Sequence, residues 1–351
     1  MLLLSGTQGA VAAPVSDLLD LPATVNARAT RALQLAVTRA GDRFVAVGER
    51  GTVLLSDDNG RSWRQAKRVP VSVALTDVHF PTPQLGWAVG HSGVVLHSAD
   101  GGETWERQLD GKQAAQRVLE DAQQHAAEGE QGARRVREAE SLVADGADKP
   151  LLSVHFADPQ RGWVVGAYGL ALGTADGGKS WRSLTASVPN PKGKHLYQVR
   201  GDGDHLLVAG EQGALFRSTD GGVSFQELRT PYAGTYFGVL NGRGTTLLAF
   251  GLRGNAWRSA DGGATWEKVE IGQPVTIAAG SVLGDGSVVL GDESGRLMRS
   301  FDDGRSVAPV SVPPAAGLTG VAQAADGALI LSGPRGLIRV EPDLLVSEAK
   351  K

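Results

Sequence analysis

Three arginines occupy one place in a repeated Gly-x-x-Gly sequence, and a group of arginines could clamp a carboxylate. They are Arg50 in GERG, Arg253 in GLRG and Arg335 in GPRG. A guanidinium presents a planar fork of N–H donors that pairs with a carboxylate through two parallel hydrogen bonds. His91 in GHSG and Tyr168 in GAYG stand in corresponding sequences and join them as candidate binding residues. We interpret them as contact residues of a binding site.

Aspartates recur in a second, more regular pattern. Six stretches fit the template Ser/Thr-x-Asp-x-Gly-x-Ser/Thr followed by an aromatic residue, except that the sixth ends in Val307: SDDNGRSW, SADGGETW, TADGGKSW, STDGGVSF, SADGGATW and SFDDGRSV. An aspartate after a strand accepts hydrogen bonds from its own turn, glycine takes the left-handed angles, and the aromatic side chain packs between sheets. We therefore interpret the template as a folding device whose structural residues are Asp58, Trp63, Asp100, Trp105, Asp176, Trp181, Asp220, Phe225, Asp261, Trp266 and Asp302.

The spacing of the template predicts the architecture. The stretches begin at 56, 98, 174, 218, 259 and 300, so four of the five steps are 41 to 44 residues and one is 76. A period of about 40 to 45 residues is the size of one four-stranded propeller blade. Each copy follows two short apolar runs joined by the Gly-x-x-Gly sequence, which predicts a strand, a tight turn and a strand. The fold class is therefore all-β, a seven-bladed β-propeller.

The seventh copy of the unit, from 318 to 340, has three strand candidates and lacks the template. We expect residues 14–345 to form a single propeller in which residues around 14 to 25 supply the missing outer strand to the last blade. The template turns then lie on one face of the disc, and the Gly-x-x-Gly turns and interblade loops on the other. Because six equivalent aspartates around a ring cannot converge on one substrate, the site belongs on the second face.

The template is the Asp-box, or BNR repeat, and resembles those of sialidases, sortilin-like receptors and the photosystem II assembly and stability factor family. The likeness to the last family is the fullest, because GWAVG at 86–90 and GWVVG at 162–166 match its repeat and nearly the whole chain is covered. The resemblance implies a non-catalytic protein-binding scaffold, an assembly factor for a membrane protein complex. It leaves open whether that complex is photosynthetic or another membrane assembly, such as a transporter.

The step of 76 residues locates an insertion between blades two and three. Residues 111–149 are rich in alanine, glutamine, glutamate and arginine, and their apolar residues fall at helical spacing on both sides of GEQG at 129–132. We predict a helical hairpin that stands on the second face. It is either a solvated decoration or a docking arm for a partner, in which Arg134, Arg135 and Arg137 meet an acidic surface.

Other classes of function find less support in the residues. A sialidase-like or other Asp-box glycoside hydrolase, or a carbohydrate-binding propeller, is the alternative reading, but no motif pairs a tyrosine with a glutamate as the sialidase mechanism needs. The seven histidines are scattered, and His79 and His155 occupy the same register in neighbouring units, so we expect neither a metal site nor a cofactor. We also expect no catalytic residues.

Composition limits the partners and the compartment. The formal charge of -3 and the spread of basic residues argue against nucleic-acid binding, and no apolar run is long enough to cross a bilayer. Residues 1–13 hold a short apolar patch and Ala10-Val11-Ala12, which indicates either a residual export signal or a tail outside the fold. We expect an exported protein, periplasmic or peripheral to the membrane, with a protein partner that is a membrane complex or its assembly intermediate.

Overall fold

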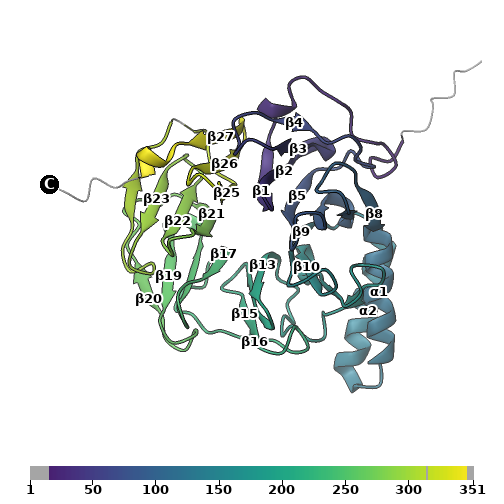
Figure 1. The fold of residues 1–351 in the computed structure, drawn as a ribbon. Helices are drawn as coiled ribbons and strands as arrows, with labels where there is room; N and C mark the ends of the chain where they lie inside the picture. Colours follow the sequence, from purple (N-terminus) through teal and green to yellow (C-terminus); the bar gives the residue numbers. More distant parts are fainter. Residues whose placement is uncertain (1–15, 314, 346–351) are drawn as a thin grey trace, which may run out of the picture.

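The computed structural model describes residues 16–313 and 315–345, so the export signal expected at 1–13 lies outside the described residues. Seven small antiparallel sheets stand around a central axis as the predicted seven-bladed propeller (Figure 1). In each sheet the strands follow one another in chain order from the axis outward, and we call them A to D. Short apolar strands alternate with turns that contain glycine. The strands are apolar because the sheet of each blade packs on the next blade.

The first three blades have four strands each. Blade one contains β1 (Gln34–Ala40), β2 (Arg43–Gly48), β3 (Val53–Ser56) and β4 (Arg64–Gln65); blade two contains β5 (Leu75–His79), β6 (Gly86–Gly90), β7 (Val95–Ser98) and β8 (Glu106–Leu109); blade three contains β9 (Leu151–Phe156), β10 (Gly162–Gly166), β11 (Ala171–Thr174) and β12 (Arg182–Ser183).

The other blades repeat this plan until the last, which has three strands. Blade four contains β13 (Leu196–Asp202), β14 (His205–Gly210), β15 (Leu215–Ser218) and β16 (Gln226–Glu227); blade five contains β17 (Tyr236–Asn241), β18 (Leu247–Gly251), β19 (Ala256–Ser259) and β20 (Glu267–Val269); blade six contains β21 (Ile277–Val282), β22 (Val288–Asp292), β23 (Leu297–Ser300) and β24 (Ala308–Val310); blade seven contains β25 (Gly320–Gln323), β26 (Leu329–Gly333) and β27 (Gly336–Val340).

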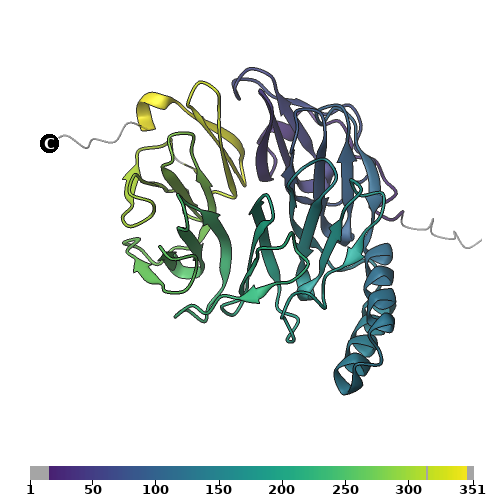
Figure 2. The same cartoon turned by 60° about the horizontal axis from the view of Figure 1, so that its bottom comes forward.

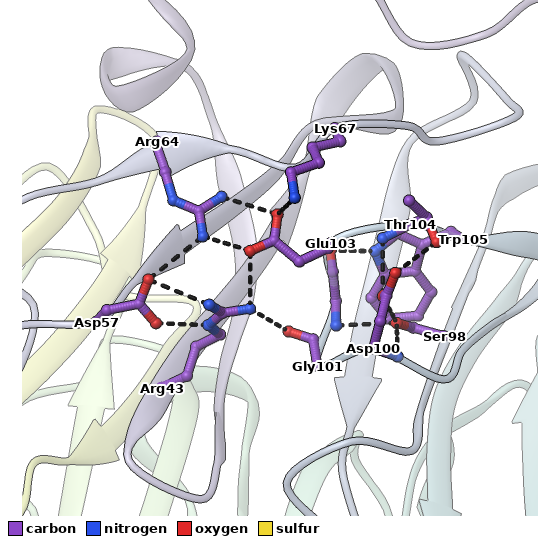
Figure 3. A network of polar contacts seen from close by, with 11 residues as sticks. Arg43, Asp57, Arg64, Lys67, Ser98, Asp100, Gly101, Glu103, Thr104 and Trp105 are labelled. Carbon is purple, nitrogen blue, oxygen red and sulfur yellow. Dashed lines mark hydrogen bonds and ion pairs between the residues drawn. The ribbon is translucent and has the colours of Figure 1, made fainter.

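Each Asp-box is the turn from strand C to strand D, and its hydrogen bonds explain its sequence (Figure 3). In blade two, Asp100 accepts from the Ser98 hydroxyl at 2.9 Å and from the Thr104 amide and hydroxyl at 2.9 and 2.6 Å. The Gly102 amide donates to the Ser98 hydroxyl at 2.8 Å. The indole N–H of Trp105 donates to the Gly102 carbonyl, and its ring is buried between blades one and two. The box thus closes its own turn and supplies the core.

The boxes also join neighbouring blades. In five of the six boxes, the carbonyl of the residue directly after the aspartate accepts a hydrogen bond from the blade before it, as the Gly101 carbonyl does from Arg43 at 3.1 Å (Figure 3). We call this bond a staple. The donor and acceptor pairs are Arg43 and Gly101, Gln108 and Gly177, Arg217 and Gly262, Arg258 and Asp303, and Arg339 and Asn59.

The closure of the ring corrects one expectation. Blade seven has three strands, and the described part of the segment around 14 to 25 forms no strand with it. That segment instead follows the connection between blades one and two, where the Leu18 carbonyl accepts from Ser72 at 2.8 Å and Leu19 is buried. The seam between blades seven and one is closed by side chains, among them the staple from Arg339 to Asn59 at 2.6 Å.

Two helices fill the insertion between blades two and three, α1 (Gly111–Gln124) and α2 (Gly129–Asp145). They form the predicted hairpin, but it does not stand on the second face. Helix α1 packs against β12, the outer strand of blade three, and the pair runs along the edge of the disc (Figures 1 and 2). The reason is the apolar stripe of α1, because Ala114, Val118 and Ala122 are buried in the core between blades two and three.

Candidate binding face and channel mouth

Five of the seven turns between strands B and C share one backbone conformation. In each, the second of the two residues between the glycines has left-handed backbone angles although it is not glycine itself. The φ angles are 54° for Arg50, 57° for Ser92, 57° for Tyr168, 52° for Gln212 and 56° for Arg253. Four of these turns are single 3-10 turns: η2 (Glu49–Gly51), η3 (His91–Gly93), η4 (Ala167–Gly169) and η5 (Leu252–Gly254). Left-handed backbone in a residue with a large side chain is costly and persists only where the surroundings impose it.

The start of strand A imposes it. A Cβ atom on Gly48 would lie 2.0 Å from the Leu33 carbonyl oxygen, and the Glu49 amide donates to the same oxygen at 3.2 Å. The equivalent contact joins Gly166 and the Ala167 amide to the Pro150 carbonyl. Backbone contacts therefore hold each turn, and the side chain at its second position is free to vary without loss of the fold.

The structure places Arg50 and Arg253 on two of these turns, in blades one and five, and Arg335 on the B-to-C turn of blade seven, which is not one of the five. Arg50, Arg253 and Arg335 are all exposed, and none makes an ion pair or a side-chain hydrogen bond with the described part of the chain. No contact between them brings the three guanidinium groups together, so each stands on its own turn. On the box face, by contrast, arginines such as Arg43 and Arg64 are held by the carboxylates of Asp57 and Glu103 (Figure 3).

The arginines of the hairpin are mostly engaged. Arg134 pairs with Glu138 at 2.7 Å and donates to the Pro191 carbonyl at 3.0 Å. Arg135 pairs with Glu128 at 2.8 Å. Only Arg137 of the three candidates is exposed without an ion pair among the residues described. An arginine patch on this arm is therefore smaller than the sequence suggests.

His91 and Tyr168 lie on turns at the base of the hairpin, and Tyr168 starts an aromatic path that sequence reasoning missed. Tyr168 is 61% exposed, and the ammonium of Lys149 lies 4.7 Å from its ring centre. The His195 ring lies 4.9 Å from Tyr168 and 6.4 Å from Tyr197, whose ring is 4.9 Å from Phe237. These residues come from blades three, four and five and lead from the rim to the axis.

The path ends at a central channel of about 550 Å³ that the A strands line. Its interior holds one ion pair, with Arg200 at 3.1 Å from Asp77, whose carboxylate also accepts from the Ser153 hydroxyl at 2.7 Å and the Val154 amide at 3.1 Å. Asp77 is the sole carboxylate among the described lining residues. Its lone pairs are occupied by partners within the wall.

Two histidines from neighbouring A strands lie beside this pair. The rings of His79 and His155 lie 4.9 Å apart in neighbouring A strands. Burial lowers the pKa of His79 to about 3, and burial followed by the neighbouring His79 lowers the pKa of His155 to about 3. Both are therefore neutral near pH 7. Among the described residues, no cluster of three or more His, Cys, Asp or Glu side chains has the geometry of a metal site.

The fold and the site define a class of protein: an Asp-box propeller whose one face is fixed by its boxes and whose other face carries varied, unpaired side chains around a channel mouth. Comparison then identifies the family. The family model described as photosynthesis system II assembly factor YCF48 matches residues 65–130 and 137–328, and the chain belongs to this family.

Similarity to individual proteins is more limited in sequence than in fold. The photosystem II assembly lipoprotein Ycf48 of Synechococcus sp. (strain CC9902) is 34% identical over 77 residues, which are 22% of this chain and 23% of that protein. A solved structure of YCF48 bound to D1 peptide has 17% identity, a TM-score of 0.66, and covers 89% of this chain and 94% of its own. The GH74 xyloglucanase from Xanthomonas campestris has 14% identity, a TM-score of 0.62, and covers 90% of this chain and 53% of its own.

The two structural likenesses show the shared propeller fold. Among the residues that the structure describes, no helix is both long and apolar enough to span a membrane.

Proposed function

We propose that this protein is a non-catalytic binding scaffold that holds a subunit of a membrane complex during its assembly, through the face that carries the B-to-C turns. The observation that supports this most is the set of three exposed arginines on B-to-C turns that are unpaired within the described chain; two of them, Arg50 and Arg253, lie on turns of the shared conformation. Membership of the assembly factor family and the relative solved with D1 peptide support the same conclusion. We place the protein outside the cytoplasm, periplasmic or peripheral to a membrane, as the lipoprotein relative suggests.

The chemistry of the face favours an acidic segment of the partner. Within the described residues, Arg50, Arg253 and Arg335 pair with no carboxylate, so a carboxylate of the partner would gain charge-assisted hydrogen bonds without breaking existing ones. Complementary charge of this kind raises the rate of encounter and selects the partner. Arg137 on α2, at the edge of the disc, is a further exposed arginine without an ion pair among the described residues.

The likeness to a GH74 enzyme raises hydrolysis of a glycan as an alternative, and the channel argues against it. Most glycoside hydrolases use two carboxyl groups on either side of the scissile bond. The described channel lining offers Asp77 alone, and Arg200, Ser153 and the Val154 amide already occupy it. If the wild-type protein hydrolyses any glycoside of a fluorogenic panel and Asp77→Asn abolishes that activity, the protein is a glycoside hydrolase.

The decisive experiment is affinity capture from detergent-solubilised membranes of the source organism with three baits. The wild-type chain should retain a membrane protein, and a bait with Arg50, Arg253 and Arg335 changed to alanine should lose it. The matched control is Arg305→Ala, which removes an exposed arginine from the box of blade six on the opposite face. Equal retention by the triple variant, or no retention by any bait, would refute the proposal.

The role of the hairpin is tested with the same assay. The two ends of the insertion touch, since a Cβ on Gly111 would lie 2.8 Å from the Cα of Ala147, so a short linker can replace residues 111–149. Because α1 covers part of the core between blades two and three, thermal unfolding must show that this variant folds. Arg137→Glu probes the arm without that risk. Reduced retention by both would make the hairpin part of the binding surface.

A further inference from the structure

The mouth of the channel on the binding face is a collar of seven equivalent side chains, one from each blade. Six A strands contain a register shift against strand B within their first residues, close to the B-to-C turn. In such a bulge two residues oppose one, and the extra side chain is redirected. The extra residue of each bulge, and the matching residue of blade seven, line the channel: Leu35, Thr76, Leu152, Tyr197, Phe237, Ala278 and Thr319.

The collar is unequal around its circumference. The small members on blades two and seven have structural partners, because the Thr76 hydroxyl donates to the Leu151 carbonyl at 2.8 Å and the Thr319 hydroxyl to the Gln34 carbonyl at 2.8 Å. Tyr197 and Phe237 form a continuous aromatic wall on blades four and five. Neither belongs to a core between blades, and both are only half-buried. Tyr197 and Phe237 therefore leave apolar surface exposed at the mouth that does not contribute to the core between blades.

The channel wall becomes polar directly beyond the collar. Asp77 follows the collar residue Thr76 by one position in β5 and pairs with Arg200 of β13 at 3.1 Å. An apolar side chain that enters from the binding face therefore meets the aromatic wall at the mouth and polar side chains next to it.

The charges beside the collar determine what kind of chain can deliver that side chain. Arg253 lies in the turn that follows β18 of blade five, the same blade that supplies Phe237, and Arg50 lies in the corresponding turn of blade one, which supplies Leu35. Both guanidinium groups lack an ion pair within the described chain. Apolar surface next to unpaired positive charge complements an acidic peptide that has a large apolar residue.

We infer that the collar is an anchor pocket: it takes one aromatic or leucine side chain of an extended, acidic peptide segment, whose carboxylates pair with Arg50 and Arg253. This inference rests on the proposed function, since it names the partner's chemistry at the same face. A buried aromatic or aliphatic anchor surrounded by polar contacts is the usual arrangement of a peptide hot spot.

The test is selection from a display library of random peptides, first on the wild-type protein and then on Phe237→Ala. Wild type should enrich peptides with a fixed aromatic or leucine position beside Asp or Glu. A selected peptide should bind Phe237→Ala about tenfold or more weakly, and its own anchor-to-alanine version should lose affinity on wild type but not further on the variant. Val282→Ala is the matched control, because it shortens an apolar side chain that lines the same channel at the far end of β21.

The outcomes separate the two proposals. Enrichment of acidic peptides without a fixed apolar position, or equal binding by wild type and Phe237→Ala, overturns the anchor pocket and leaves the acidic partner in place. Failure of the wild-type protein to enrich any peptide, together with failed capture from membranes, overturns both. Thermal unfolding of Phe237→Ala and Val282→Ala checks that each variant is folded, so that weaker binding reports on the pocket.

Discussion

At the scale of single residues, the box aspartates have carboxyl groups whose pKa is lowered by their own turn. In Asp58, Asp176 and Asp220 the hydrogen bond from the serine hydroxyl four residues later is the main cause that lowers the pKa, to about 2 in each. Further hydrogen bonds from the backbone amide of that serine and from the first hydroxyl of the box act in the same direction. A carboxylate with this many donors resists protonation.

These pKa values predict an acid-dependent loss of stability. An unfolded aspartate has a pKa of about 3.9, so the unfolded chain binds more protons than the folded one between that pH and about 2. The stabilisation by Asp176 is therefore complete above about pH 5 and is lost as the pH falls through about 2. We expect Asp176→Asn to lower the urea midpoint of unfolding near pH 6, and the difference from wild type to vanish toward pH 2.

The control is Asp42→Asn, which changes an aspartate whose side chain is 100% exposed. Its midpoint should follow that of wild type at every pH. A difference between Asp176→Asn and wild type that stays constant with pH would contradict the assigned cause.

Residues could be assigned from the sequence where all their contacts are local. Asp100 meets Ser98 and Thr104 within seven residues, so the repeated template states the whole arrangement. Tyr197 and Phe237 could not be found in this way. Their place at the channel mouth depends on a one-residue bulge and on strands from other blades, and the equivalent positions share no side-chain chemistry. Aligning the first residues of the A strands across the repeats would have placed Tyr197 and Phe237 at the same position of their blades.

At the scale of elements, the two helices of the hairpin differ in how they are held. Helix α1 begins at a complete capping box, in which Asp110 accepts from the amides of Lys112 and Gln113 and the Gln113 side chain accepts from the Asp110 amide. Helix α2 has no side-chain cap, and only Gly132 and Ala139 are buried along it. The first turn of α1 therefore anchors the arm.

We predict that Asp110→Ala loosens the hairpin and leaves the propeller intact. Loss of such a cap costs about 1 kcal/mol, which corresponds to roughly fivefold faster hydrogen exchange for the amides of α1. Exchange of the strand amides in blades one to seven should not change. Glu138→Ala is the control, because it removes only the exposed pair with Arg134 and should have a smaller effect. Equal acceleration across the blades would show that the hairpin is not a separate unit.

The sequence predicts that the helical hairpin exists, but it does not predict how the hairpin is oriented on the propeller. The periodic apolar residues placed helices within 111–149, where α1 and α2 lie. The pattern does not say whether the alanine stripe of α1 meets α2 or the blades. In the structure it does both, and burial against β12 draws the pair to the edge of the disc.

At the scale of the whole molecule, the seam between blades seven and one is the one place where neighbouring blades are not consecutive in the chain. Arg339, whose side chain is 10% exposed, bridges the seam to the Asn59 carbonyl and also pairs with Asp326 and Glu341 within its own blade. Arg61 adds a second bridge, at 3.0 Å from Asp326. The repeat count predicts an extra strand from the N-terminal segment in blade seven. That segment does not reach blade seven, because Leu19 is buried against blades one and two.

We predict that Arg339→Ala weakens this seam. Loss of a hydrogen bond from a charged group at a mostly buried site should lower the free energy of unfolding by about 2 kcal/mol. Hydrogen exchange should rise selectively in β1 and β25. Arg217→Ala removes the same staple between blades four and five, which are joined by the chain, and should not increase exchange at the seam. Unchanged exchange in β1 and β25 after Arg339→Ala would refute this role.

The seam also sets how the ring would respond to a mechanical load. The described chain starts along blades one and two, with Asp20 paired to Arg107, and finishes beside blade six, where the Leu345 carbonyl accepts from Arg299. Tension applied between these two attachments acts across the boundary that no covalent bond spans. We therefore expect the ring to separate first between blades seven and one, while the other neighbouring blades stay joined by the chain.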